Sequence, residues 1–82
     1  MDRRSVVGAL RAAGVADRLY VVEGVHEQVP VPPDFYFLRP GGPGWEVGVY
    51  ERGRYEVIDR LADEGDACAS FYRHLVRRPA GR

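Results

Sequence analysis

The stretch WEVGVYERGRYEVID, residues 45–59, constrains the fold more than any other part of the sequence. Apolar and polar residues alternate on both sides of a short turn, a pattern typical of two antiparallel strands that bury one face. We predict a three-residue loop, residues 51–53, in which Gly53 takes the positive φ that this loop type requires. A loop one residue shorter would place Glu46 opposite Asp59, and like charges directly across a strand pair are destabilising. The residue pairs expected to face each other are Val49 and Tyr55, Val47 and Val57, and Trp45 and Asp59.

Helix and strand signals elsewhere complete the expected secondary structure. Asp2 and Asp63 stand where helix caps are favoured, and Gly14 stands where a helix commonly ends. The proline-rich segment EGVHEQVPVPP, residues 23–33, cannot continue a strand ladder because proline lacks a donor N–H. The expected helices span residues 3–13 and 64–78, and the expected strands span residues 19–22, 34–39, 45–50 and 54–60.

These elements predict an α+β fold in a single domain, residues 1–82. The order α-β-β-β-β-α with short connections predicts a small antiparallel meander sheet of three to four strands, with the N- and C-terminal helices packed on one face. Because side chains alternate along a strand, Phe35 and Phe37 cannot share a face with Tyr36. Ile58 would be exposed on the outer face unless a bulge or a covered edge removes it. We expect a core of Phe35, Phe37, Trp45, Val47 and Tyr55, and an outward face of Tyr36, Glu46, Tyr50, Arg54 and Glu56.

Length, charge and cysteine content argue against several functional classes. A chain of 82 residues buries only about 60–65% of its unfolded surface, which leaves little room for the enclosed cavity of an enzyme acting alone. The 12 basic and 12 acidic side chains balance, so no overall field would attract nucleic acid or anionic lipid. The single cysteine, Cys68, allows no internal disulfide and no thiolate metal site. We therefore expect a protein that is not an enzyme and has no metal and no cofactor.

Neither a membrane span nor a secretory signal is evident in the sequence. No apolar run approaches the ~20 residues that a membrane span requires, and the start MDRRSVVGAL lacks a hydrophobic signal core. We expect a cytoplasmic protein that makes no contact with a membrane.

Three groups of residues carry possible chemistry, and for each an ordinary role is favoured: solvated loop residues for the first, a core cysteine and a solvated histidine for the second, and a hairpin connection for the third. His26, Glu27 and Asp34 lie close together in sequence, but no nucleophile or oxyanion donor accompanies them. Cys68 and His74 lie six positions apart on one expected helix, so their side chains point to different sides. The glycines of PGGPGW precede a strand, whereas a phosphate-binding loop leads into a helix.

Two runs of residues carry a resemblance to a known family. WEVGVYERG, residues 45–53, is followed after a strand by DEGDAC, residues 63–68, and a Y-x-x-x-G-x-H run covers residues 20–26. In this combination the chain resembles small bacterial immunity proteins of polymorphic-toxin systems, in which an E-R-G-type turn and a strand precede an acid-rich helix start with an Ala-Cys pair. The chain departs from that pattern at residues 61–62, where the family has an aromatic residue and a Ser or Thr cap, so that Asp63 would cap the helix instead.

The resemblance implies a noncatalytic inhibitor that docks on a cognate bacterial toxin, encoded nearby, and occludes its active site. An acidic loop or an outward aromatic side chain would enter a site built for a charged substrate, which favours fast association and a buried anchor. The positions to test for partner binding are Glu23, His26, Glu27 and Asp34 in the loop, with Tyr36, Tyr50, Glu51 and Arg54 on the hairpin.

A small nucleic-acid-binding accessory domain is the alternative. The element order is similar to that of double-stranded RNA-binding domains, and four arginines cluster in residues 73–82. That family places lysines at the start of its last helix, where this chain carries three acids in residues 63–66, so nucleic acid is not the expected partner. A third possibility, a small enzyme or ligand-binding protein, would need a concave site beside His26 or His74.

Overall fold

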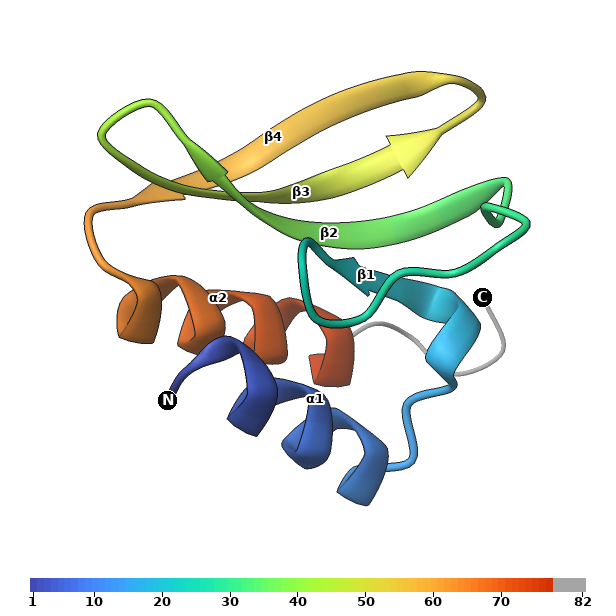
Figure 1. The fold of residues 1–82 in the computed structure, drawn as a ribbon, viewed down its shortest axis with the longest axis horizontal. Helices are drawn as coiled ribbons and strands as arrows, with labels where there is room; N and C mark the ends of the chain where they lie inside the picture. Colours follow the sequence, from blue (N-terminus) through green and yellow to red (C-terminus); the bar gives the residue numbers. More distant parts are fainter. Residues whose placement is uncertain (78–82) are drawn as a thin grey trace.

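Residues 1–77 of the 82 are described by a computed structural model (Figure 1). Within them the chain forms helix α1 (Arg3–Ala12), a short 3₁₀ helix η1 (Asp17–Leu19), strands β1 (Tyr20–Val22), β2 (Asp34–Gly41), β3 (Gly44–Glu51) and β4 (Arg54–Leu61), and helix α2 (Glu64–Arg77). These boundaries agree with the expected ones to within two residues. The expected end of the last helix at residue 78, its stop at Pro79, and Arg78 and Arg82 of the arginine cluster lie outside the described residues.

The fold is α+β with two layers, a sheet and a pair of helices. The sheet has the strand order β1-β2-β3-β4. Helix α2 lies against one face of it and α1 packs beside α2 on the same side, as predicted, so that both helices contribute to one core. The opposite face carries no helix in the described part of the chain (Figure 1). The expected order of elements is therefore confirmed.

Strand β1 differs from the prediction because it runs parallel to β2. The prediction of an antiparallel sheet throughout is wrong for this pair, whereas β2, β3 and β4 form the expected antiparallel meander. A parallel neighbour requires a long crossover connection, and an antiparallel neighbour can be reached by a tight turn. Residues 23–33 provide that crossover, whereas their prolines by themselves indicate only an interruption of the strands.

Local interactions determine both ends of α1. The Asp2 side chain caps the helix by accepting a hydrogen bond from the backbone N–H of Ser5 at 2.8 Å. At the other end Gly14 has a φ of +82°, and the N–H of Val15 donates to the carbonyl of Leu10 at 3.0 Å. This is the Schellman-type end that the sequence predicts.

Helix α2 begins as its sequence predicts and buries one side. The Asp63 side chain accepts a hydrogen bond from the N–H of Asp66 at 2.8 Å, which confirms Asp63 as the cap. The residues that α2 buries are Ala67, Cys68, Ser70, Phe71 and Leu75. No helix within residues 1–77 is both long enough and apolar enough to cross a membrane.

The β3–β4 hairpin closes with a two-residue loop, so the predicted three-residue loop is wrong. Arg52 and Gly53 have φ values of +52° and +81°, which suit a type I′ turn, whose twist matches that of the flanking strands. Further along the hairpin a β-bulge adds Ile58 as an extra residue on β4. The bulge was anticipated as a way to remove Ile58 from the outer face, but the Ile58 side chain is still 42% exposed.

The bulge removes the charge conflict between Glu46 and Asp59 that a two-residue loop would otherwise create. It shifts the register so that Glu46 faces Arg60 and Val47 faces Asp59. Opposite charges then face each other, and Asp59 lies on the side of the helices, where the hydroxyl of Ser70 donates to its carboxylate at 2.8 Å. The conflict between Glu46 and Asp59 that the sequence predicts for a two-residue loop is thus avoided by the bulge at Ile58.

The two faces of the sheet are assigned differently from the prediction for several aromatic residues. Phe35 and Phe37 are buried, but they lie on the face without helices, and Tyr36 packs against the helix-side core. Tyr55, expected in the core, is 55% exposed. The pleat dictates only that neighbouring residues point to opposite faces, and helix packing decides which face is covered. The main core consists of Val6, Val7, Leu10, Tyr20, Val22, Leu38, Val47, Ala67, Cys68, Phe71 and Leu75.

The remaining face assignments are mostly confirmed. Trp45 and Val47 lie on the helix side, and Glu46 and Tyr50 lie on the opposite, outward face. Arg54 and Glu56 are exposed as expected but belong to the helix side, because Glu56 pairs directly with Val49. They escape burial because they lie next to the β3–β4 turn, and this end of the hairpin is away from both helices (Figure 1).

Candidate functional site

The sheet face without helices carries a cluster of four aromatic rings, Phe35, Phe37, Tyr50 and Tyr55, which we call the aromatic face. The strand register brings Phe35 and Tyr55 to either side of Tyr50. Ring centroids lie 4.9 Å apart for Phe35 and Tyr50, 4.6 Å for Tyr50 and Tyr55, and 5.3 Å for Phe37 and Tyr55. The rings support one another, so Tyr55 is held in a defined position although it is exposed.

Beside the aromatic face lies a row of three charged side chains. The Arg39 guanidinium lies 4.6 Å from the ring centroid of Phe37 and 4.7 Å from that of Tyr55. Its Nε donates to Glu46 at 2.9 Å, and Arg60 donates to the second carboxylate oxygen of Glu46. These hydrogen bonds lower the pKa of Glu46, and the one from Arg39 has the largest effect. The Glu46 side chain is only 13% exposed, so it neutralises its partners in a partly desolvated position.

Replacing Glu46 with glutamine is expected to lower stability at neutral pH and to have a smaller effect in acid. Because the folded-state pKa of Glu46 lies below its unfolded value of ~4.3, its contribution is complete above that value and is lost as the pH falls through the folded-state pKa. Urea unfolding of both proteins at pH 7 and pH 3 checks this. A difference between the two proteins that is equal at both pH values would contradict it.

The proline-rich loop, residues 23–33, is attached at its base to β1, to α1 and to η1. The backbone groups of Val22 and His26 exchange hydrogen bonds of 2.9 and 2.8 Å, which closes a tight turn after β1. Glu27 accepts from the N–H of Gly24 at 2.6 Å inside this turn. The Arg3 guanidinium donates to the carbonyl of Glu23 at 3.0 Å, so the start of α1 also holds the loop.

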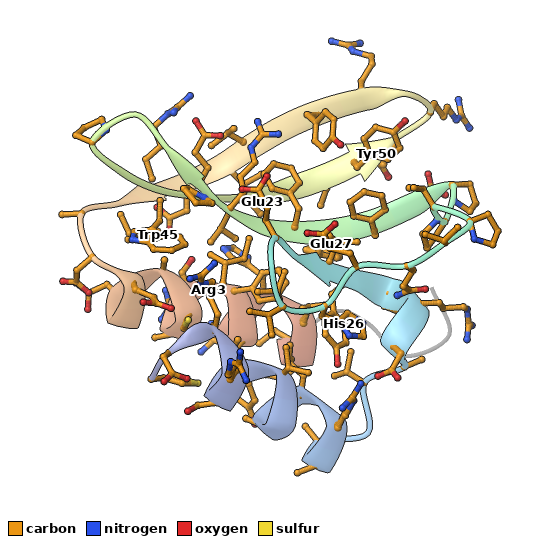
Figure 2. All side chains as sticks on the ribbon, in the orientation of Figure 1. Arg3, Glu23, His26, Glu27, Trp45 and Tyr50 are labelled. Carbon is orange, nitrogen blue, oxygen red and sulfur yellow. The ribbon has the colours of Figure 1, made fainter. Side chains whose placement is uncertain are left out.

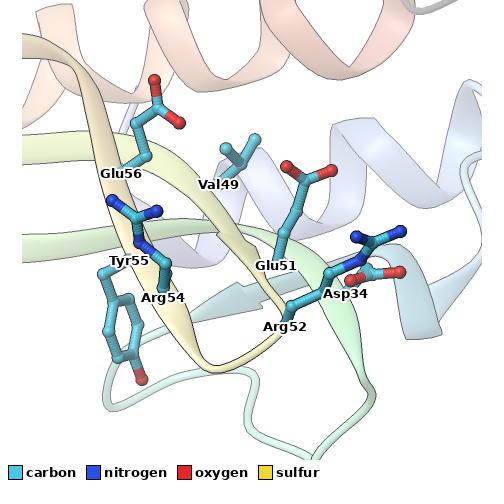
Figure 3. A pocket seen from close by; sticks show the side chains of 7 residues that line it. All are labelled: Asp34, Val49, Glu51, Arg52, Arg54, Tyr55 and Glu56. Atoms are coloured by element: carbon cyan, nitrogen blue, oxygen red, sulfur yellow. The ribbon is translucent and has the colours of Figure 1, made fainter.

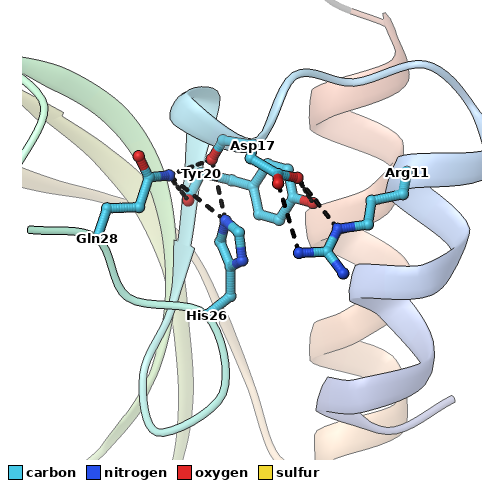
Figure 4. A network of polar contacts seen from close by, with 5 residues as sticks. All are labelled: Arg11, Asp17, Tyr20, His26 and Gln28. Carbon is cyan, nitrogen blue, oxygen red and sulfur yellow. Dashed lines mark hydrogen bonds and ion pairs between the residues drawn. The ribbon is translucent and has the colours of Figure 1, made fainter.

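His26 and Gln28 attach the loop to η1 and β1 through a polar network (Figure 4). The His26 ring stacks on buried Tyr20 with centroids 4.5 Å apart, and its Nε2 lies 3.0 Å from the carbonyl oxygen of Asp17. Gln28 donates to the same carbonyl, and the Tyr20 hydroxyl donates to the Asp17 carboxylate at 3.3 Å. A hydrogen bond from Arg11 lowers the pKa of Asp17, and burial raises the pKa of Tyr20.

Beyond this attached base the loop exposes two valines. Val29 is 97% exposed and Val31 is 64% exposed, although both are apolar. Val31 borders the same hollow as Phe37 and Tyr55, so the loop and the aromatic face form one continuous surface. A bound macromolecule can therefore contact both at once.

A second hollow lies at the hairpin end of the sheet, on the helix side (Figure 3). It has a volume of about 670 Å³ and is bordered by Asp34, Glu51, Arg54 and Glu56 among others. In Figure 3 Glu51 and Glu56 point to the same side as Val49, and Tyr55 points the opposite way. Most of the bordering side chains are exposed and both signs of charge are present, so this is an open groove rather than a closed active site.

The structure distributes the expected partner-binding residues over several places. Glu23 and Glu27 border the hollow next to the aromatic face, and Tyr50 lies in that face. His26 and Tyr36 are half-buried in structural contacts, so the expectation of an outward Tyr36 is wrong. The remaining expected residues, Asp34, Glu51 and Arg54, lie together at the hairpin groove.

The residues of α2 with possible chemistry, Cys68 and His74, lie in buried or half-buried positions. Cys68 is completely buried, and desolvation raises its pKa to about 11, so almost no reactive thiolate forms at neutral pH. His74 is half-buried on the same helix, with no hydrogen bond to another described side chain. No three His, Cys, Asp or Glu side chains of the described region come together as metal ligands would.

Sequence reasoning missed Val29, Val31 and the exposure of Tyr55. A signal for the valines exists, because β-branched residues between prolines have no ladder neighbour against which to pack. Tyr55 is predicted on the wrong face because its face depends on the hairpin register.

The chain matches no protein-family model, and no curated protein and no solved structure is significantly similar to it.

Proposed function

We propose that this protein is a noncatalytic protein-binding inhibitor, an immunity protein that docks on a cognate bacterial toxin and occludes its active site. The observation that carries the proposal is the surface on which exposed Val31 and Tyr55, 64% and 55% exposed, border one hollow, with Val29, 97% exposed, two residues before Val31 in the same loop. Large apolar side chains gathered on one exposed surface are typical of sites for protein partners.

The attachment of the loop favours tight binding. Ordering a free loop on association costs conformational entropy, about 0.5–1.5 kcal/mol for each immobilised side chain. Here the hydrogen bonds of His26, Gln28 and Glu27 hold the base of the loop before any partner arrives. Tyr55, supported by neighbouring rings, has the character of an interface hot spot.

The choice of a toxin as partner rests on the resemblance carried by residues 45–53 and 63–68. Occlusion needs only a projecting surface of suitable shape, and the exposed loop beside the aromatic face provides one. Glu23 and Glu27 on this loop would accelerate association with a toxin whose cleft is basic.

The test is co-expression with the protein encoded by the adjacent gene, followed by growth and affinity measurements. We expect the wild-type protein to restore growth and to form a stable complex. The double substitution Val31→Ala, Tyr55→Ala should weaken that complex at least ~30-fold, the equivalent of a ~2 kcal/mol hot spot. Val76→Ala is the matched control, because Val76 is 40% exposed but lies on α2. A toxin that kills equally in the presence and absence of the protein would reject the proposal.

Nucleic-acid binding is the alternative, and stacked aromatic rings next to Arg39 and Arg60 are the feature that favours it. Glu46 neutralises part of that positive charge, and Glu23 and Glu27 lie beside the same rings. A phosphate backbone would therefore meet little net attraction here. A salt-dependent mobility shift of single-stranded RNA or DNA at micromolar protein would favour the alternative, and no shift at low salt would remove it.

A further inference from the structure

A small hollow opens where the proline-rich loop meets the aromatic face. Its volume is about 210 Å³. The rings of Phe35, Phe37 and Tyr55 form its aromatic part, and Glu23, Glu27 and Gln28 border it from the loop, with Arg39 at the sheet. Figure 2 labels Glu23 and Glu27 on the loop beside the sheet.

The size of the hollow limits what it can hold. Sites for metabolites and drug-sized molecules enclose about 300–1,000 Å³, so this hollow is too small for most of them. A single protruding side chain of another protein is a better match in size. Such a guest would enter with the partner's surface closing over the loop.

The charges around the hollow favour a cationic guest. The Glu23 side chain makes no hydrogen bond or ion pair with another side chain or backbone group in residues 1–77, and Glu27 engages only one of its two carboxylate oxygens, with Gly24. The positive charge of Arg39 is already matched by Glu46 at 2.9 Å. Two carboxylates with free acceptor capacity therefore remain at the edge of an aromatic hollow.

We infer that this hollow binds an arginine side chain of the partner protein, an inference that rests on the proposed function. Arginine combines an apolar stem, a planar cation that stacks on aromatic rings, and a fork of donors that fits carboxylates. Because Arg39 already lies over the rings of Phe37 and Tyr55, the stem of the guest would pack on Phe35 and Val31, which also line the hollow. Its guanidinium would reach Glu23 and Glu27. A lysine would gain the charge attraction but lose the stacking and the paired hydrogen bonds.

The first experiment titrates the whole protein with N-acetyl-arginine amide while its ¹H–¹⁵N and aromatic NMR signals are followed. N-acetyl-citrulline amide, which has nearly the same shape and no charge, is the ligand control. We expect arginine to shift the signals of Tyr55, Val31 and the two glutamates with a millimolar dissociation constant that rises with salt. Equal shifts with citrulline, or no shifts at these residues, would overturn the inference.

Paired charge variants test the two carboxylates. Glu23→Gln with Glu27→Gln should weaken arginine binding at least fivefold, and glutamine at position 27 can still accept the hydrogen bond from Gly24. Glu56→Gln with Asp66→Asn removes the same number of charges from exposed positions on β4 and α2 and should leave binding unchanged. Equal losses for the two pairs would show a general charge effect and contradict the site.

The same variants separate this inference from the proposed function. If the wild-type protein protects cells and the Glu23→Gln, Glu27→Gln variant binds the toxin equally well, the arginine site is wrong and the inhibitor function stands. If the adjacent-gene product is not bound at all but free arginine binds at the hollow, the proposed partner is wrong and the site stands.

Discussion

Replacing Gly48 with alanine is expected to lower the free energy of unfolding by about 3 kcal/mol, at the upper end of the range for overpacked interiors. A Cβ atom at this position would lie 2.1 Å from the carbonyl oxygen of Glu56 and 2.6 Å from Cζ of Phe37. The first neighbour is backbone of β4, and Phe37 is only 2% exposed, so neither can move aside without disturbing the sheet. Gly48 lies at the bulge, where β3 and β4 change register.

The Gly48→Ala change should also alter the aromatic face. Displacement of Phe37 moves the ring against which Tyr55 and Arg39 pack. Urea unfolding measures the stability, and the NMR signal of the Tyr55 ring reports the local change. Gly8→Ala is the control, because a Cβ at Gly8 meets no atom within 4 Å and alanine is favoured inside α1 by up to ~1 kcal/mol. A Gly48→Ala protein as stable as wild type would contradict the close packing described here.

Replacing Phe71 with alanine is expected to cost about 3–5 kcal/mol, the usual loss for a large aromatic side chain in a core. Phe71 is completely buried on α2, and its ring meets that of Tyr20 edge-on at 6.2 Å. At ~0.05–0.15 kcal/mol per residue, a chain of 82 residues has only about 4–12 kcal/mol of stability. The variant should therefore lose a large part of that stability and melt at least ~10 °C below the wild-type protein, which a circular dichroism melt would detect.

Two further substitutions make the Phe71 result interpretable. Phe71→Leu keeps most of the volume and should cost well under half as much as alanine. Val76→Ala on the same helix removes a side chain that is 40% exposed, and it should cost less than ~1 kcal/mol. If Phe71→Ala melts within a few degrees of Val76→Ala, the helix does not depend on this packing.

Interactions between residues close in sequence determined what could be predicted of the fold. Asp2 meets Ser5, Val15 meets Leu10, and Asp63 meets Asp66, each within five positions along the chain. Such caps and turns form wherever the local sequence allows them, so the element boundaries and the order of elements follow from the sequence. Part of the candidate site follows for the same reason, because the loop at residues 23–33 is marked by its prolines.

Only the tertiary structure decided how these elements combine. The direction of β1, the bulge that brings Glu46 to Arg60, and the choice of the face covered by helices all depend on contacts between segments far apart in sequence. A shift of one residue in a strand pair exchanges its two faces, so Tyr55 is predicted on the wrong side although its strand is found. Tyr36 is predicted on the wrong side for another reason, because the pleat alone does not show which face the helices cover. The hollow beside Glu23 and Glu27 likewise exists only because β1 is parallel to β2, and its connecting loop must cross back along the sheet.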